Sequence, residues 1–372
     1  MTAAPPAPRT RPEDGPQLSS VRERLWEAVL DGDEYAAVDV VLGARDAGLD
    51  EETLLLDVIG AVQQRVGVEW AADRISVAQE HATTAINERA VAALSGAGRR
   101  PGARPRGRVT VTCVDGEWHA LPARLVAEVL RLRGWQVDYL GAQTPTPHLI
   151  AHVHRTNPAA VLLSSSLPTR LPTAHAAITA CQAVGMPVMA GGAAFGEGGR
   201  YARLLGADHW ARDARDAADL LEGGTAQPYT SVSRQAVDDL PHLADQEYTM
   251  VARSRPRLVK QTLADLEDRF PAMAAYDDAQ RERTAEDIAH IVDFLAAALY
   301  VDDARLFAGF LTWTADILAA RGVPVHSLAL GLDVLSRQLH DFPRSSSLLE
   351  QGASALAGHR PGSPAAGPGS GA

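Results

Sequence analysis

Glu117 and His119 stand one residue apart in the segment from Asp115 to Pro122, between an apolar, strand-like run and a helix-like apolar pattern. A carboxylate that accepts the proton of one imidazole nitrogen leaves the other nitrogen available as a metal ligand. In an extended or turning loop, both side chains can project to the same side. The sequence therefore predicts that His119 is a metal ligand oriented by Glu117.

One imidazole cannot hold a bare metal ion alone. His148 and His152, four residues apart, would lie on one helix face and provide a zinc site in principle, but no matched carboxylate or thiolate accompanies them in the sequence. A solvated helix face is the simpler interpretation of that pair. A lone ligand is sufficient when the metal arrives in a macrocycle that fills its equatorial positions, which points to a corrinoid or a haem. The alternative for His119 is a buried loop histidine without a ligand.

Composition restricts the class of protein. The chain of 372 residues carries a net charge of −11, which argues against a nucleic-acid-binding surface or adhesion to an anionic membrane. It contains no apolar run of the ~20 residues that a membrane span requires and no signal-peptide pattern at its start. We therefore expect a cytoplasmic protein. With only Cys113 and Cys181, neither a disulfide framework nor a thiolate metal cage is available.

The chain divides into segments of different periodicity. Residues 1–16 and 358–372 are rich in Pro, Ala, Gly or Ser and are expected to be disordered. Apolar residues recur three and four apart through 17–97, which predicts a four-helix bundle. Residues 98–107 form a linker; their arginines are typical of a nucleic-acid patch or, as we favour in an acidic chain, of a solvated segment.

Strand and helix patterns alternate through 108–225. Strands are predicted at 109–114, 135–140, 159–164, 187–190 and 208–211, with helices between them. Strands that are apolar along their whole length predict a parallel sheet covered on both faces, in a flavodoxin-like α/β domain. Residues 226–357 are helical again and form an all-α domain. In such a sheet, ligands bind at the carboxyl ends of the strands, which is where Glu117 and His119 fall.

Three elements in order resemble the cobalamin-binding domain of methionine synthase and corrinoid proteins: Glu117-x-His119, the run from Ser165 to Thr169 with Leu167, and Gly191-Gly192. The resemblance implies that His119 is the lower axial ligand of cobalt and that the nucleotide tail of the cofactor lies beside the Ser, Thr and Gly positions. Glu117 replaces the usual Asp, which keeps the chemistry, and Pro122 replaces the usual Gly, so the local turn must differ.

A second motif, Trp70 followed after nine residues by Glu80-His81, resembles the light-sensing cobalamin photoreceptors. In that family the helical bundle caps the upper face of adenosylcobalamin, and these residues surround the adenosyl group. A core tryptophan with a surface Glu-His pair is the alternative. Ala71 stands where the family often has a histidine that captures cobalt after illumination, so a bis-histidine light state here would require another side chain, such as His81.

The C-terminal helices resemble globin-like sensor domains, and the order of the three domains resembles the photocobilins, which bind cobalamin and the bilin biliverdin. Because no cysteine lies beyond Cys181, attachment of biliverdin would be noncovalent. Arg253 and Arg257, in a basic cluster with Arg255 and Lys260, are predicted to bind its propionates; otherwise the cluster is a solvated helix face. A haem held by His290, His326 or His340, on apolar-periodic helices, is the alternative cofactor.

The predicted function is therefore a light sensor, not an enzyme, in which breakage of the cobalt–carbon bond changes conformation or association with an effector protein or a second copy. The photoreceptor family's gene regulators carry an N-terminal DNA-binding domain, which the short segment before the bundle cannot provide, so direct DNA binding is not expected. Two alternatives stand beside this function: a corrinoid carrier for a methyltransferase, and a haem-type globin sensor.

Overall fold

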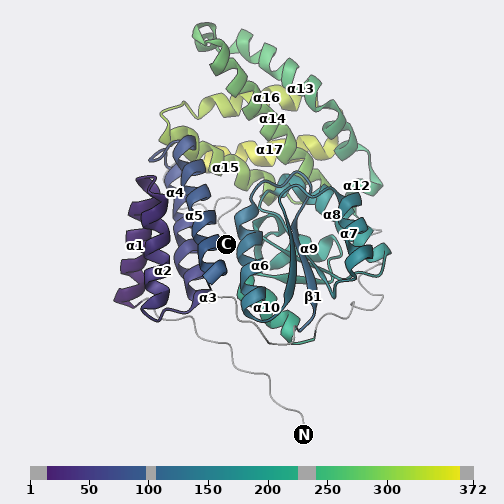
Figure 1. The fold of residues 1–372 in the computed structure, drawn as a ribbon. Coiled ribbons are helices and arrows are strands. Elements are labelled where there is room, and N and C mark those ends of the chain that lie inside the picture. Colours follow the sequence, from purple (N-terminus) through teal and green to yellow (C-terminus); the bar gives the residue numbers. More distant parts are fainter. Residues whose placement is uncertain (1–14, 98–105, 225–239, 361–372) are drawn as a thin grey trace. The chain divides into compact units, whose positions relative to one another are not determined.

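A computed structural model describes residues 15–97, 106–224 and 240–360. The described residues form two compact units, of which the first comprises residues 15–66 and 76–97 and the second comprises residues 67–75, 106–224 and 240–360 (Figure 1). The expected disorder of residues 1–14 and 361–372 and most of the expected linker, residues 98–105, lie outside the described residues. Each unit is described separately below.

The first unit is helical. Its elements are α1 (Pro16–Leu30), α2 (Glu34–Asp46), α3 (Glu51–Thr53), a π-helical stretch η1 (Leu54–Gly60), most of α4 (Ala61–Ala71) and α5 (Val77–Ala97). Asp33 caps α2 by accepting hydrogen bonds from two backbone N–H groups, as an N-cap aspartate does. Leu25, Val41, Ile59 and Leu94 lie in its apolar interior. The role of this unit as a cap over a cofactor stays a prediction.

A parallel five-stranded sheet forms the centre of the second unit, which confirms the predicted sheet of a flavodoxin-like domain. The strands are β1 (Arg108–Cys113), β2 (Gln136–Gly141), β3 (Val161–Ser164), β4 (Val188–Gly191) and β5 (His209–Ala211), and their order is β2-β1-β3-β4-β5. All four neighbouring pairs are parallel, with Val111 opposite Leu162 and Leu163 opposite Ala190. Because parallel strands are connected by crossovers, the loops after β1, β3 and β4 all leave from the same edge.

Helices cover the sheet on both faces. α6 (Ala120–Leu132) packs against α10 (Ala214–Glu222), and α7 (Thr146–Thr156) packs against α8 (Leu171–Ala183). The crossover through α6 runs toward β2 and those through α7 and α8 run the other way, so right-handed connections place the two pairs on opposite faces. Short helical turns η2 (Pro168–Arg170), η3 (Ala193–Phe195), η4 (Glu197–Gly199) and helix α9 (Arg200–Leu204) complete this part.

The C-terminal helices belong to the same unit as the sheet. They are α12 (Pro241–Ala244), α13 (Glu247–Arg269), η5 (Pro271–Ala275), α14 (Asp278–Val301), α15 (Ala304–Ala320), α16 (His326–Gln338) and α17 (Pro343–Gly358). One hydrophobic cluster contains Val188 and Ile178 of the sheet part together with Leu295 and Phe307 of the helices. A globin-like character of these helices stays a prediction. No helix among the described residues is long and apolar enough to cross a bilayer.

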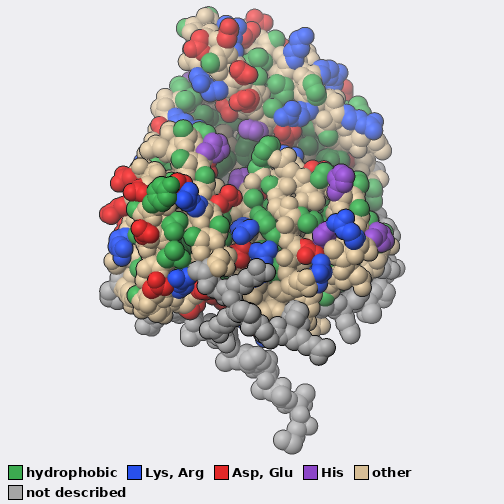
Figure 2. Space-filling model, viewed as in Figure 1, with side chains coloured by type: hydrophobic (Ala, Val, Ile, Leu, Met, Phe, Trp, Pro, Cys, Tyr) green, Lys and Arg blue, Asp and Glu red, His purple; other side chains and the backbone are tan. Residues whose placement is uncertain are grey.

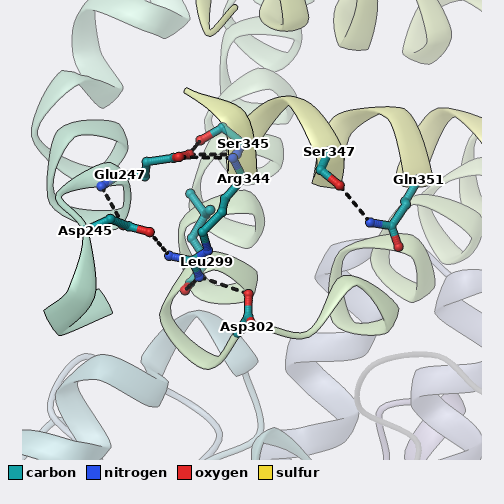
Figure 3. A network of polar contacts seen from close by, with 8 residues as sticks. All are labelled: Asp245, Glu247, Leu299, Asp302, Arg344, Ser345, Ser347 and Gln351. Carbon is teal, nitrogen blue, oxygen red and sulfur yellow. Dashed lines mark hydrogen bonds and ion pairs between the residues drawn. The ribbon is translucent and has the colours of Figure 1, made fainter. Parts of the chain in front are cut away.

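A buried polar network fixes the start of α17 (Figure 3). Glu247 accepts hydrogen bonds from the backbone N–H groups of Arg344 (3.0 Å) and Ser345 (2.8 Å) and from the Ser345 hydroxyl (2.8 Å). The Arg344 guanidinium donates to Asp245 and Asp302. Glu247 therefore acts as a remote N-cap, which satisfies donors that the first turn of a helix leaves unpaired.

Replacing Glu247 by alanine should lower the free energy of unfolding by about 2 kcal/mol, because three buried or half-buried donors lose their acceptor. Urea denaturation of the full-length protein measures this change. Gln351→Ala is the matched control, since the bond from Gln351 to Ser347 on the same helix is exposed and should contribute little. Equal losses in the two variants would contradict the capping role.

Two histidines lie in an aromatic cluster where α8 meets α12 and α14. The His175 Nδ1 lies 2.6 Å from the Tyr300 hydroxyl, and the His242 ring stacks on the Tyr300 ring with centroids 4.0 Å apart. The His175 Nε2 and the His242 Nδ1 are buried without a hydrogen-bond partner among the described residues. Burial lowers the pKa of both imidazoles; the neighbouring His242 adds to this effect at His175, while Tyr300 opposes it at His242.

Stability should therefore fall as the solution becomes acidic. An unfolded histidine takes up a proton near its ordinary pKa of 6.5, whereas these folded histidines bind one only at lower pH. Their contribution is complete above pH 6.5 and is lost as the pH falls through the lowered values. Urea midpoints between pH 8 and pH 5 should decline less steeply for His242→Phe, which keeps the stacked ring. His148→Gln is the control, because His148 is exposed. If the urea midpoint of His242→Phe declines with pH as steeply as that of the wild type, protonation of His242 is not the cause of the decline.

Candidate functional site

Glu117 is the buried centre of the loop that leaves β1. Its side chain is 0% exposed, and its Oε2 accepts hydrogen bonds from the Ser165 hydroxyl (3.0 Å) and from the backbone N–H groups of Ser166 (2.7 Å) and Leu167 (3.1 Å). All three donors come from the loop that follows β3. The carboxylate therefore ties the loops after β1 and β3 together at the carboxyl edge of the sheet.

The other carboxylate oxygen orients His119. Glu117 Oε1 lies 2.6 Å from the His119 Nδ1 and accepts the His119 backbone N–H at 3.0 Å. Because an ionised carboxylate can only accept, Nδ1 carries a hydrogen, and in the neutral imidazole Nε2 keeps its lone pair. The His119 side chain is 53% exposed. The carboxylate therefore orients the His119 ring as the sequence predicted, and a ligand role for the imidazole stays a prediction.

Hydrogen bonding keeps Glu117 ionised. Burial on its own would raise the pKa of this carboxyl group, but the hydrogen bonds from His119 and Ser166 and the attraction of the imidazole lower it to about 2. Burial, with a smaller effect of the Glu117 charge, raises the pKa of the Cys113 thiol to about 12. The thiol is therefore protonated near neutral pH and is a poor metal ligand.

The ends of β3 and β4 are packed against each other without side chains between them. Gly192 has φ +99°, and a Cβ atom there would lie 2.3 Å from the Ser165 carbonyl oxygen. A Cβ on Gly191 would lie 3.3 Å from the Ala211 carbonyl oxygen. Glycine is required at 192 because no other residue fits both the backbone conformation and the space. The two glycines therefore let the ends of β3, β4 and β5 approach one another closely.

The structure gives Ser165 a role that differs from the expected contact with a nucleotide tail. Ser165 is 0% exposed, and its hydroxyl donates to Glu117. Sequence reasoning missed this bond because it joins residues 48 apart in the chain. Leu167 and Thr169 follow in the same loop and are half-buried. The structure thus brings Glu117, His119, Ser165, Leu167, Gly191 and Gly192 to one edge of the sheet.

The residues of the second motif are divided between the units. In the first unit, Glu80 lies in the first turn of α5 and His81 follows it, with the His81 Nδ1 2.9 Å from Glu80 Oε2 and the His81 side chain 76% exposed. In the second unit, the Trp70 ring lies 6.3 Å from the Trp313 ring, and the Arg321 guanidinium lies 5.0 Å from the Trp70 ring centre. Trp70 therefore packs on residues of the C-terminal helices.

The basic cluster on α13 is divided by its ion pairs. Arg255 donates to Asp293 on α14 at 2.6 Å and 3.0 Å, whereas Arg253 and Arg257 are exposed. A propionate role for the latter two stays a prediction.

The histidines proposed for a haem are all exposed. His290 lies within α14, His326 begins α16, and His340 lies beyond the end of α16, so its expected helical position was wrong. Periodicity placed His340 on the helix because Leu339 continues the apolar pattern, but the helix ends at Gln338.

The proposed zinc pair on α7 also has a different environment from the expected one. His152 Nε2 lies 3.1 Å from a carboxylate oxygen of Asp138 on β2, a partner that the sequence did not reveal, while His148 is exposed. Among the described residues, no group of three or more His, Cys, Asp or Glu side chains is arranged to hold a metal ion. Within that part of the chain, His119 would thus be a single protein ligand.

Comparison with known protein families identifies the ligand class. Residues 107–220 match a family model described as a B12 binding domain, and residues 21–95 match a second model with the same description. The first matched segment contains the sheet and the Glu117–His119 pair, and the second lies mostly in the helical first unit.

Similar proteins include the HTH-type transcriptional repressor CarA of Myxococcus xanthus, which is 29% identical over 155 residues, or 41% of this chain. The match spans about half the length of that relative. The Methanosarcina barkeri monomethylamine corrinoid protein is 19% identical, with a TM-score of 0.48, over 55% of this chain and 99% of the other. A cobalamin-binding protein from Desulfitobacterium hafniense DCB-2 is 22% identical, with a TM-score of 0.32, over 55% and 97% of the two chains.

The residues at the sheet edge fit a cobalamin. The corrin ring fills the equatorial positions of its cobalt, so one axial nitrogen is what the protein must supply, and His119 is an exposed imidazole with a fixed tautomer. His119 would hold the cofactor, and Glu117 would fix the ring and raise its basicity.

Proposed function

We propose that this protein is a light-sensing receptor that binds adenosylcobalamin through His119 and is not an enzyme. The observation that supports it is the hydrogen bond between His119 and a buried, ionised Glu117, at the edge of a B12-binding domain. The motif of Trp70, Glu80 and His81, which resembles the cobalamin photoreceptors, supports the adenosyl form and the response to light. When bound, adenosylcobalamin supplies a cobalt–carbon bond that light breaks.

The chain's own residues would convert loss of the adenosyl group into a conformational change. Trp70, Glu80 and His81 are the residues that the motif assigns to that group, and they would lose an ordering contact. Trp70 packs on Trp313 and Arg321, so a change in its position alters a contact of the C-terminal helices. Such an element biases a two-state equilibrium, and the output would be altered self-association or altered binding of an effector protein.

Illumination tests this proposal directly. The full-length protein loaded with adenosylcobalamin should show a lasting change of its absorption spectrum under green light, together with a change of elution volume in gel filtration. Protein loaded with hydroxocobalamin, which lacks the adenosyl group, is the control and should change in neither respect. If the loaded protein photolyses no differently from free adenosylcobalamin and keeps its elution volume, the sensor proposal fails and the corrinoid carrier of a methyltransferase becomes the better interpretation.

We also propose that biliverdin binds noncovalently to the C-terminal helices and extends the response to longer wavelengths. The exposed guanidinium groups of Arg253 and Arg257 are available to propionates on one helix. Because the sheet and these helices share one core, the test uses the full chain: Arg253→Gln with Arg257→Gln should weaken biliverdin binding measured by red absorbance. Wild-type protein that gains a haem spectrum and no red band would favour the haem sensor.

A further inference from the structure

Arg170 places a guanidinium group over the loop that carries Glu117 and His119. It ends the short turn η2 between β3 and α8, and η2 is packed against α14. Gly116 has φ +78°, and a Cβ atom there would lie 2.9 Å from Arg170 Nη1 and 3.1 Å from Cζ. The guanidinium therefore lies directly on the backbone next to Glu117, in space that any side chain at 116 would fill.

This guanidinium has no partner within the described part of the chain. Its Nε is buried without a hydrogen bond, and no ion pair or side-chain hydrogen bond joins Arg170 to a described residue, neighbouring Asp115 included. Arg200 also has a buried Nε without a partner, but its other nitrogens pair with Asp303 and Tyr201. Buried donors are almost always satisfied, and a charged group at a ligand-binding edge without a partner indicates that the ligand provides the acceptor.

The chemistry of cobalamin contains one group suited to this position. The side chains of the corrin ring are neutral amides, whereas the nucleotide tail carries a phosphodiester, the anionic group of the organic part of the molecule. Hydrogen bonds between a guanidinium and a phosphate are charge-assisted and can be bidentate, and are about twice as strong as those between neutral groups. We infer that Arg170 binds the phosphodiester of the cobalamin nucleotide tail. The inference rests on the proposed binding of cobalamin through His119 but not on the response to light.

Arg170 lies beside the Glu117 loop but is not one of the residues of the cobalamin-binding motif. Glu117 reaches the loop after β3 through Ser165, Ser166 and Leu167, and Arg170 returns from the same loop to Gly116. One carboxylate thus joins the two loops, and one guanidinium lies on the Gly116 backbone without a side-chain hydrogen bond. The carboxylate is fully used by the protein, and the guanidinium is left for the ligand.

Binding of corrinoids that differ in the tail tests the assignment. Hydroxocobalamin has the complete tail, cobinamide lacks the phosphate, ribose and base, and cobinamide phosphate restores the phosphate alone. Absorbance titrations of apo full-length protein give Kd for each. Arg170→Ala should weaken hydroxocobalamin binding about tenfold to a hundredfold and cobinamide binding less than twofold. Arg170→Ala should again weaken binding when the ligand is cobinamide phosphate. Arg170→Lys should recover part of the affinity for hydroxocobalamin, because lysine keeps the positive charge but lacks the fork of guanidinium donors.

Arg155→Ala is the matched control, since it removes an exposed arginine from the far end of α7 and should leave every Kd unchanged. Equal losses for hydroxocobalamin and cobinamide, or no loss in either, would overturn the phosphate assignment. If Arg170→Ala does not fold, Arg170→Lys decides the question. The ratio of its Kd for hydroxocobalamin to its Kd for cobinamide should then differ from the wild-type ratio, and an unchanged ratio would overturn the assignment. A wild-type protein that binds no corrinoid overturns both the inference and the proposed function, whereas one that binds but ignores light overturns the sensor alone.

Discussion

Replacing His119 by alanine is expected to move the spectrum of bound cobalamin to the base-off form and to lower the affinity by on the order of 100-fold or more. The imidazole is exposed, and its Nδ1–H is held by Glu117, so its Nε2 is the nitrogen that the protein presents as a ligand. Titration with hydroxocobalamin, followed by absorbance, measures both changes. The buried Glu117 carboxylate loses one hydrogen-bond donor, so the free energy of unfolding should also fall, by about 1 kcal/mol.

Added imidazole sharpens this test. Free imidazole should fill the space left by the truncated side chain and restore a base-on spectrum in His119→Ala. His154→Ala is the matched control, because His154 is exposed on α7 and should affect neither spectrum nor affinity. A bound spectrum identical in wild type and His119→Ala would show that His119 is not the lower ligand.

Replacing Glu117 by alanine should have two large effects at once. The free energy of unfolding should fall by about 3 kcal/mol, because buried donors of Ser165, Ser166 and Leu167 lose their acceptor. Affinity for cobalamin should fall tenfold to a hundredfold, since the His119 ring loses the group that fixes its tautomer. Urea denaturation of the apo protein and corrinoid titration measure the two effects separately.

A second buried glutamate separates stability from ligand orientation. Glu128 is 3% exposed on α6 and pairs with Arg124 at 2.7 Å and Arg131 at 2.6 Å, away from the loop. Glu128→Gln should lower stability without changing the affinity of the folded protein. Glu117→Asp, which restores the residue usual in the resembling family, should retain more affinity than Glu117→Ala. Equal affinities of wild type and Glu117→Ala for cobalamin would show that the Glu117 carboxylate does not contribute to cofactor binding.

The sheet was predictable because its central strands β3 and β4 are short, apolar and mostly buried. The expected strands at 109–114 and 187–190 differ by one residue at each end from β1 and β4. The contact between Glu117 and His119 was predictable because the two residues are only two positions apart in one loop, which leaves few ways to separate their side chains. The end of α16 was not, because the apolar period continues through Leu339, beyond the last helical residue.

The sequence by itself determined the elements whose cause is local: the strands, the helix periods, and a carboxylate next to an imidazole after the first strand. Only the tertiary structure decided what the distant residues do. Ser165 donates to Glu117, Arg170 lies on Gly116, and Trp70 packs on Trp313. The reason is that these contacts join segments about 50 residues or more apart, and residue type alone does not specify which buried donor meets which acceptor. For His119, the sequence predicted a ligand, and the fold supplied the fully buried anchor that orients it.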